Sequence, residues 1–219
     1  MNNLSKRVIT SVILFSLLLL CLYSSIYLWI LLLIVTSIIA FVEFNNLFKK
    51  IWKGKKEKVY FINFLSLCYL IFFVIAAFTL AKVKENILFI IFVCIFSDIG
   101  GYVVGKTIGG KKLIKISPKK TISGSIGSFL FSLIPIIIVT FVYYEKMQIS
   151  ITGIILLTLL MSFICQSGDI FISYFKRKAK VKDTGTILPG HGGLLDRIDG
   201  MLFVIPFIYL IYNYVLKYF

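Results

Sequence analysis

Acidic residues and histidine are scarce in this sequence. Nine Asp and Glu stand against 24 Lys and Arg, with a single His, so the formal net charge is +15. The four Cys lie inside apolar runs, with no Cys-x-x-Cys pair and no partnering His. This usage is typical of buried small side chains, and it implies neither a disulfide framework nor a zinc site. No internal repeat or low-complexity linker divides the chain.

Apolar residues dominate what remains. They make up 59% of the 219 residues, with a mean hydropathy of +0.99, whereas a soluble domain has about 45–50%. This is too much apolar surface for a disordered chain or for a water-soluble nucleic-acid binder. The composition predicts an all-α polytopic membrane protein with one membrane domain and no sizeable soluble domain.

Seven apolar runs are long enough to be membrane-spanning helices, because backbone polar groups in lipid must be paired internally. The runs are Val8–Ser24, Ile26–Phe44, Val59–Ala81, Ile87–Gly105, Ser125–Tyr144, Ile151–Phe175 and Met201–Leu216. Only Tyr23-Ser24-Ser25 divides the first two, which favours a tight hairpin over one long tilted helix. No small-x-small cleavage site follows a short apolar core, so the first run is expected to be a retained span.

The distribution of positive charge predicts the orientation. With the N-terminus in the cytoplasm, the inner segments hold 20 of the 24 Lys and Arg, and the outer segments hold four. This asymmetry supports seven spans and an inner-membrane location of the bacterial type. We expect residues 1–86 to form N-terminal spans with a basic loop, and residues 87–219 to form the catalytic region.

Glycine and aspartate gather in two stretches, 97–127 and 167–200. These stretches hold 13 of the 15 Gly and all five Asp. Glycine lets a ligand approach the backbone closely, and a short carboxylate can bind a metal ion. With the Lys residues nearby, the pattern indicates a site for metal and phosphate.

Asp98 and Asp169 lie inside apolar runs. At 1.5 Å per residue, Asp169 is about 10 Å, and Asp98 about 12 Å, inside the boundary marked by the next basic residue. A carboxylate at this depth needs a partner or a wet cavity. A shared polar cavity open to the cytoplasm is favoured, and two structural acids, each paired with a Lys, are the alternative.

The stretch from Gly100 to Lys112, with Gly105-Lys106-Thr107, is not a nucleotide-binding P-loop, because the glycine spacing is wrong and no strand precedes it. A Lys-rich segment follows, from Lys111 to Lys120. Lys111, Lys112 and Lys115 are expected either to touch anionic lipid or to join the site. Lys119, Lys120 and Thr121 follow a Pro and precede a Gly, which is typical of a turn that contacts phosphate.

The second stretch ends with Asp196 and Asp199, three residues apart. If a helix has begun there, both carboxylates face one side of it. Beside a Lys and Arg cluster, such carboxylates suit Mg²⁺ and substrate phosphates. His191, without a second His or Cys, is expected to order the loop, with general-base work as the alternative.

The run Ser173-x-Phe-Lys-Arg-x4-Lys-Asp-x-Gly-x2-Leu-Pro-x-His-Gly-Gly-Leu-x-Asp-Arg-Ile-Asp199 resembles the signature of phosphatidate cytidylyltransferases, also called CDP-diacylglycerol synthases. It matches at every fixed position over 27 residues. Ser97-Asp-Ile-Gly-Gly-Tyr and Ser117-Pro-Lys-Lys-Thr also resemble that family. The resemblance covers about residues 90–215. Ile122-Ser123-Gly124 departs from the Trp-Glu-Gly that members often carry, so no role of that Glu transfers to this chain.

The resemblance implies that CTP and phosphatidate react to give CDP-diacylglycerol and pyrophosphate, for phospholipid biosynthesis. It also implies a two-metal centre, with Mg²⁺ as one ion, in a funnel open to the cytoplasm, and a homodimer. By this resemblance, Asp169 and Asp196 bind the metal.

The expected site residues fall into four groups. The catalytic candidates are Asp169, Lys182, Asp196 and Arg197, and the metal-binding candidates are Asp169, Asp196 and Asp199. The candidates for binding substrate phosphate are Lys119, Lys120, Thr121, Lys176 and Arg177. The supporting candidates are Asp98, Ser117, Ser173, Asp183, His191, Gly192 and Gly193.

Two other functions remain as alternatives. A related CTP-dependent lipid kinase or nucleotidyltransferase would use another lipid acceptor. A cation-coupled transporter would use Asp98 and Asp169 as its ion site, but it should carry charge in several spans. Here the charges cluster at one end instead.

Overall fold

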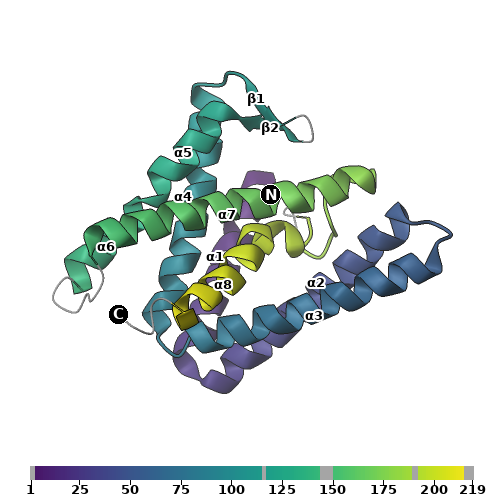
Figure 1. Cartoon of the computed structure of the whole chain (residues 1–219), viewed down its shortest axis with the longest axis horizontal. Helices are drawn as coiled ribbons and strands as arrows, with labels where there is room; N and C mark the ends of the chain where they lie inside the picture. Colours follow the sequence, from purple (N-terminus) through teal and green to yellow (C-terminus); the bar gives the residue numbers. More distant parts are fainter. Residues whose placement is uncertain (1–2, 115–116, 144–149, 189–191, 215–219) are drawn as a thin grey trace. The chain divides into compact units, whose positions relative to one another are not determined.

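The structure, a computed structural model, describes residues 3–114, 117–143, 150–188 and 192–214. The chain divides into two compact units (Figure 1). The first unit comprises Met1–Lys84 and Phe175–Ile198, and the second comprises Glu85–Tyr174 and Asp199–Phe219. Each unit is described by itself. The functional division at residue 86 stays a prediction.

The first unit begins with three helices, α1 (Asn3–Ser24), α2 (Ile26–Ile51) and α3 (Lys56–Leu80). Ser25 separates α1 from α2 with an extended backbone (φ −158°, ψ 142°), and its Oγ accepts a hydrogen bond from the Tyr27 N–H at 3.2 Å. Ser is a favoured residue at this position because its side chain satisfies a free amide of the first helical turn. The predicted break at Ser25 is therefore confirmed, and one continuous helix is excluded.

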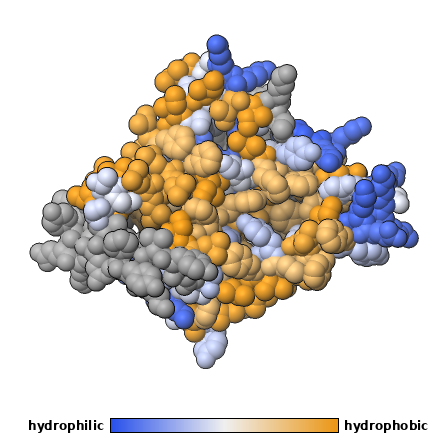
Figure 2. All heavy atoms as spheres, viewed as in Figure 1, coloured by the Kyte–Doolittle hydropathy of each residue, from blue (hydrophilic) through white to orange (hydrophobic). Residues whose placement is uncertain are grey.

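Helices α2 and α3 pack against each other along their length (Figure 1). Asn63 Nδ2 donates to Asn45 Oδ1 at 2.9 Å, which adds a polar contact to this otherwise apolar pair. Six exposed lysines surround the turn between the two helices: Lys49, Lys50, Lys53, Lys55, Lys56 and Lys58. Figure 2 shows hydrophilic side chains at this end of the pair and apolar side chains along the helices.

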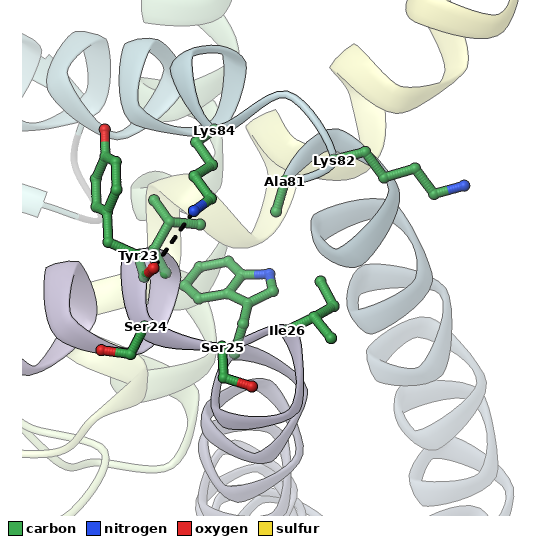
Figure 3. A pocket seen from close by; sticks show the side chains of 9 residues that line it. Tyr23, Ser24, Ser25, Ile26, Ala81, Lys82 and Lys84 are labelled. Atoms are coloured by element: carbon green, nitrogen blue, oxygen red, sulfur yellow. Dashed lines mark hydrogen bonds between the residues drawn. The ribbon is translucent and has the colours of Figure 1, made fainter.

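A pocket of about 260 Å³ lies where the α1–α2 turn meets the start of α4 (Figure 3). Lys84 crosses it: its Nζ donates to the Tyr23 carbonyl at 3.4 Å and lies 4.8 Å from the centre of the Tyr23 ring. These contacts fasten the start of α4 to the α1–α2 turn.

The second unit contains α4 (Lys84–Thr107), β1 (Lys112–Ile114), β2 (Ser117–Thr121), α5 (Ile122–Ser132) and α6 (Ile134–Tyr143). Two later helices, α7 (Ile151–Lys178) and α8 (Leu195–Tyr214), each contribute to both units. Strands β1 and β2 pair antiparallel, with Lys112 opposite Thr121. The all-α expectation missed this hairpin, which forms in the Lys-rich segment. The turn predicted at Lys119, Lys120 and Thr121 is wrong, because these residues lie in strand β2.

The predicted span Ser125–Tyr144 is two helices, because α5 ends at Ser132 and α6 begins at Ile134. Pro135 explains the break. It has no N–H to donate to the carbonyl four residues earlier, whereas it is tolerated in the first turn of a new helix. At the junction, the Ile136 N–H donates a hydrogen bond to the Leu133 carbonyl, three residues earlier, at 3.1 Å.

Small residues let α4 and α5 pack backbone against backbone. A Cβ added at Gly127 would lie 2.5 Å from Val104 Cβ and 2.7 Å from the Gly100 carbonyl oxygen. A Cβ at Gly101 would lie 2.6 Å from Ser128 Oγ. Such seams are typical of helices that associate in membranes, where close backbone contact replaces the hydrophobic effect.

Four of the described helices are long and apolar enough to cross a membrane: α2, α3, α4 and α7. Two shorter apolar helical segments, Ile9–Ser24 and Ile122–Ile138, accompany them. The membrane character predicted from composition is thus supported. The count of seven spans and the cytoplasmic N-terminus stay predictions.

Gly127→Ala tests the α4–α5 seam. The added methyl group would collide with backbone at Gly100, so we expect a loss of about 1–3 kcal/mol in stability. Thermal unfolding in detergent micelles measures it. Leu130→Ala, which changes an exposed residue of the same helix, is the control and should shift the midpoint less. Equal shifts would contradict the tight packing.

Candidate functional site

Asp169 is the centre of a polar cluster in the second unit. It lies on α7 and forms a salt bridge with Lys120, at the end of β2. Ser173 Oγ, one turn later on α7, donates to Asp169 Oδ1 at 3.2 Å. The side chains of Lys120 and Asp169 are 24% and 30% exposed. For Asp169, the structure therefore shows the lysine pairing that was the alternative to a shared cavity, and a cavity shared with Asp98 stays a prediction.

Two glycines let α8 pack directly against α7 beside Asp169. A Cβ at Gly168 would lie 2.9 Å from the Asp199 carbonyl oxygen and 2.6 Å from the Phe203 ring. A Cβ at Gly200 would overlap Cys165 Sγ. The Ser167-Gly-Asp sequence is therefore a contact point, at which the glycine brings the carboxylate-bearing turn of α7 against Asp199.

Further hydrogen bonds within the second unit join the first glycine-rich stretch to α7 and stabilise the start of α5. Ser97 Oγ and Ser162 Oγ, on α4 and α7, are 2.9 Å apart. Ser125 Oγ donates to Gln166 Oε1 at 2.6 Å. Thr121 Oγ1 accepts from the Gly124 N–H at 3.0 Å and so caps α5. Helix α7 is thus hydrogen-bonded to both α4 and α5.

Asp196 is the centre of a second cluster, which belongs to the first unit. Its Oδ1 accepts from Lys176 Nζ at 2.7 Å. Its Oδ2 accepts from the Thr184 N–H at 2.7 Å, from Thr184 Oγ1 at 3.0 Å and from the Gly193 N–H at 3.2 Å. The side chains of Lys176 and Asp196 are only 11% and 6% exposed. Asp196 therefore ties the loop before α8 to the end of α7.

Glu43, on α2, completes this cluster although the sequence analysis gave it no role. It is 2% exposed. Its carboxylate accepts from Thr184 Oγ1 at 2.6 Å and from the N–H groups of Leu194 and Leu195 at 2.9 Å each. Its position in the sequence could have indicated this role, because Glu43 is an acid within a predicted membrane span.

Glycines make room for the Glu43 carboxylate. A Cβ at Gly185 would lie 2.5 Å from Glu43 Oε1, and a Cβ at Gly193 would lie 2.6 Å from Glu43 Oε2. Gly192 has φ +86°, in the left-handed region that favours glycine. The glycines of the second stretch thus allow the loop to close on two carboxylates.

Helix α7 carries residues of both clusters. Asp169 and Ser173, in the second unit, are four residues apart and share one face of this helix, whereas Lys176 belongs to the first unit. Helix α8 begins at Leu195, which confirms the premise that Asp196 and Asp199 lie in a helix that has already begun.

Other expected residues lie as follows. Asp98, Arg177, Lys182, Asp183 and Arg197 are exposed. Asp199 is buried, and its Oδ1 accepts from the Gly200 N–H at 2.8 Å. Ser117 lies in β2. His191 and the side chain of Lys119 fall outside the described residues. The roles predicted for all of these residues stay predictions.

The two clusters differ in their capacity for a metal ion. Among the described residues, no group of three or more His, Cys, Asp or Glu is close enough to hold one. A carboxylate offers about four lone-pair sites. From the described side chains and amides, Asp169 accepts from two groups, Lys120 and Ser173, whereas Asp196 accepts from four. The arrangement therefore suits a cation bound by Asp169, with substrate oxygens as further ligands, better than one bound by Asp196.

Comparison with known proteins matches the model of the Cytidylyltransferase family to residues 46–215. The chain belongs to this family. The match contains both glycine-rich stretches and starts just after Glu43.

Several curated relatives are phosphatidate cytidylyltransferases. That of Bacillus subtilis (strain 168) is 40% identical over 130 residues, which are 58% of this chain and 48% of the relative. That of Staphylococcus haemolyticus is 45% identical over 122 residues, 55% of this chain and 46% of the relative. That of Synechocystis is 43% identical over 123 residues, which are 54% of this chain and 40% of the relative. The matched segment thus spans about half of each relative's length or less.

Asp196→Ala tests the buried ion pair of the first unit. It would leave the Lys176 ammonium and two loop amides without their acceptor, so we expect a loss of about 3–5 kcal/mol. Thermal unfolding in detergent micelles measures the change. Lys176→Met in the same chain should recover part of it, because the unpaired charge is then removed. No recovery in the double variant would contradict a stabilising role of the pair.

Proposed function

We propose that this chain transfers the cytidylyl group of CTP to phosphatidate, giving CDP-diacylglycerol and pyrophosphate. The salt bridge between Lys120 and Asp169, with Ser173 beside it, is the observation that carries the proposal. It joins the two glycine- and aspartate-rich stretches, and it places a carboxylate on the membrane-type helix α7 beside an ammonium group from β2. Relatives with that name support the choice of substrates.

The reaction joins two anions. A phosphate oxygen of phosphatidate attacks the α-phosphorus of CTP, and the bond from that phosphorus to the bridging oxygen of the β-phosphate breaks, releasing pyrophosphate. The attacking oxygen is already deprotonated near neutral pH, so the main task is to neutralise charge rather than to remove a proton. Because no strong general base is needed, the presence of only one His in the whole sequence is consistent with this reaction.

The basic residues have distinct proposed roles. Lys120 and Lys176 lie next to carboxylates, which hold their ammonium groups in place for a substrate phosphate. Arg177, Lys182 and Arg197 are exposed and can reach the triphosphate or the leaving pyrophosphate. Lys119 and Thr121 flank Lys120 in β2, and Thr121 caps the start of α5.

Mg²⁺ is the proposed cofactor, with a second ion of unspecified identity. Asp169 would hold it, with Asp199 and Asp196 as further proposed ligands, and the ion would neutralise charge on the phosphate oxygens. Asp169 has lone pairs left for this purpose, whereas Asp196 would first have to give up a present donor.

The site is proposed to open to the cytoplasm, because that side carries 20 of the 24 basic residues in the seven-span arrangement. The proposed location is the inner membrane of a bacterial-type cell. A homodimer is proposed from the family resemblance alone.

Radiolabelled CTP tests the function directly. The purified chain is incubated in mixed micelles with phosphatidate, Mg²⁺ and CTP labelled at either the α- or the γ-phosphate. We expect label to enter lipid from the α-position only. Transfer from the γ-position would indicate a lipid kinase, and no lipid label would overturn the proposal.

Asp169→Asn tests the central carboxylate. It keeps the size of the side chain but removes the charge that pairs with Lys120 and would bind the metal, so we expect kcat to fall at least about 100-fold. Glu85→Gln makes the same change at an exposed position in the first turn of α4, and it should retain activity. Near-full turnover by Asp169→Asn would refute the assignment.

Chelation tests the metal. With EDTA in excess, lipid labelling should stop, and excess Mg²⁺ should restore it, because no protein cation can replace a metal that binds several phosphate oxygens at once. Full activity in EDTA would exclude a dissociable metal ion.

A further inference from the structure

We propose that Glu43 is a positioning residue for cytidylyl transfer. Its carboxylate, on α2, holds the loop before α8 in the conformation that presents Asp196 and Lys176 to the anionic substrates. The inference rests on the proposed function. All the residues that carry it belong to the first unit.

The first step is the contact between α2 and the start of α8. Leu194 and Leu195 stand where α8 begins, and the amides at a helix start have no partner inside the helix. Glu43 accepts from both amides at 2.9 Å, one with each carboxylate oxygen. A negative charge at this end of a helix is also favoured by the helix dipole.

The second step is a relay through Thr184. Its Oγ1 lies 2.6 Å from Glu43 Oε2 and 3.0 Å from Asp196 Oδ2. The hydroxyl has one hydrogen to share between two carboxylates, so the positions of the two acids depend on each other. Asp196 then reaches Lys176 at 2.7 Å. A continuous chain of polar contacts thus runs from α2 to the basic end of α7.

The third step is that neither packing nor helix capping requires an acid at position 43. A residue on an apolar helix could fill this space with carbon, and a helix start can be capped by its own Ser, Thr, Asp or Asn. A buried carboxylate is costly in a membrane segment and is typically functional. Groups that orient a site residue in this way commonly change activity 10- to 100-fold when replaced.

Glu43→Gln is the decisive variant because it keeps the size of the side chain but replaces one acceptor oxygen by a donor NH₂ group. All three groups that contact the carboxylate are donors. An amide has one acceptor oxygen, so its NH₂ would face either the Leu194 N–H or the Leu195 N–H. We expect kcat to fall about 10- to 100-fold in folded protein, nearly as far as in Glu43→Ala.

Glu57→Gln is the matched control. Glu57 makes the same acid-to-amide change in the first turn of α3, in the same unit, but is exposed. It should keep the activity of the unaltered chain. Activity is expressed per folded molecule, from the monodisperse fraction in detergent, so that a loss of folded protein alone does not lower it.

Thr184 provides a second pair of variants if Glu43 variants fail to fold. Thr184→Val removes the bridging hydroxyl at nearly constant volume, whereas Thr184→Ser keeps it. We expect Val to lower kcat about 10-fold or more and Ser to restore most of it. If Thr184→Ser loses as much activity per folded molecule as Thr184→Val, the relay through the hydroxyl is overturned.

Hydrogen exchange separates this inference from the proposed function. In Glu43→Gln, the amides of Thr184, Leu194 and Leu195 should exchange faster than in Glu57→Gln. Unchanged kcat per folded molecule in Glu43→Gln overturns the positioning role. If the unaltered chain transfers no cytidylyl group, the proposed function fails. In that case, faster amide exchange in Glu43→Gln would still show that Glu43 stabilises the loop before α8. Unchanged exchange would overturn this stabilising role as well.

Discussion

A carboxylate placed in an apolar helix must be surrounded by hydrogen-bond donors, and this constraint governs both units of the chain. Asp169 has Lys120 and Ser173 around it, and Glu43 has Thr184 and two amides at the start of α8. Without these donors, the charged group would be costly to bury. In each unit, a helix with the composition of a plain membrane span therefore fixes a hairpin or a loop from elsewhere in the chain.

Glycine is what allows these donors to come close enough. At Gly185 and Gly193 a methyl group would collide with the Glu43 carboxylate, and at Gly168 it would push α8 away from the turn that carries Asp169. At these positions glycine thus has a packing role, because the backbone approaches a carboxylate or another backbone directly.

Part of this arrangement could be predicted because its signal is local. The depth of Asp169 in an apolar run indicated a buried acid that needs a partner, and Ser25 marked a helix boundary. The β1–β2 hairpin and the break at Leu133 were missed. The hairpin depends on pairing between lysine-rich segments that carry no strand pattern, and the break depends on a proline within an otherwise uniform apolar run.

By itself, the sequence determined the membrane class, the approximate positions of most helices, the two stretches that carry the polar chemistry and the likeness to a cytidylyltransferase. These follow from composition, periodicity and residue order, which act over short distances along the chain. Only the tertiary structure decided which donors each acid receives. The donors of Glu43 lie 141 to 152 residues after it. Partners so distant in sequence are chosen by how the helices pack, because burial leaves a carboxylate no water to bind instead.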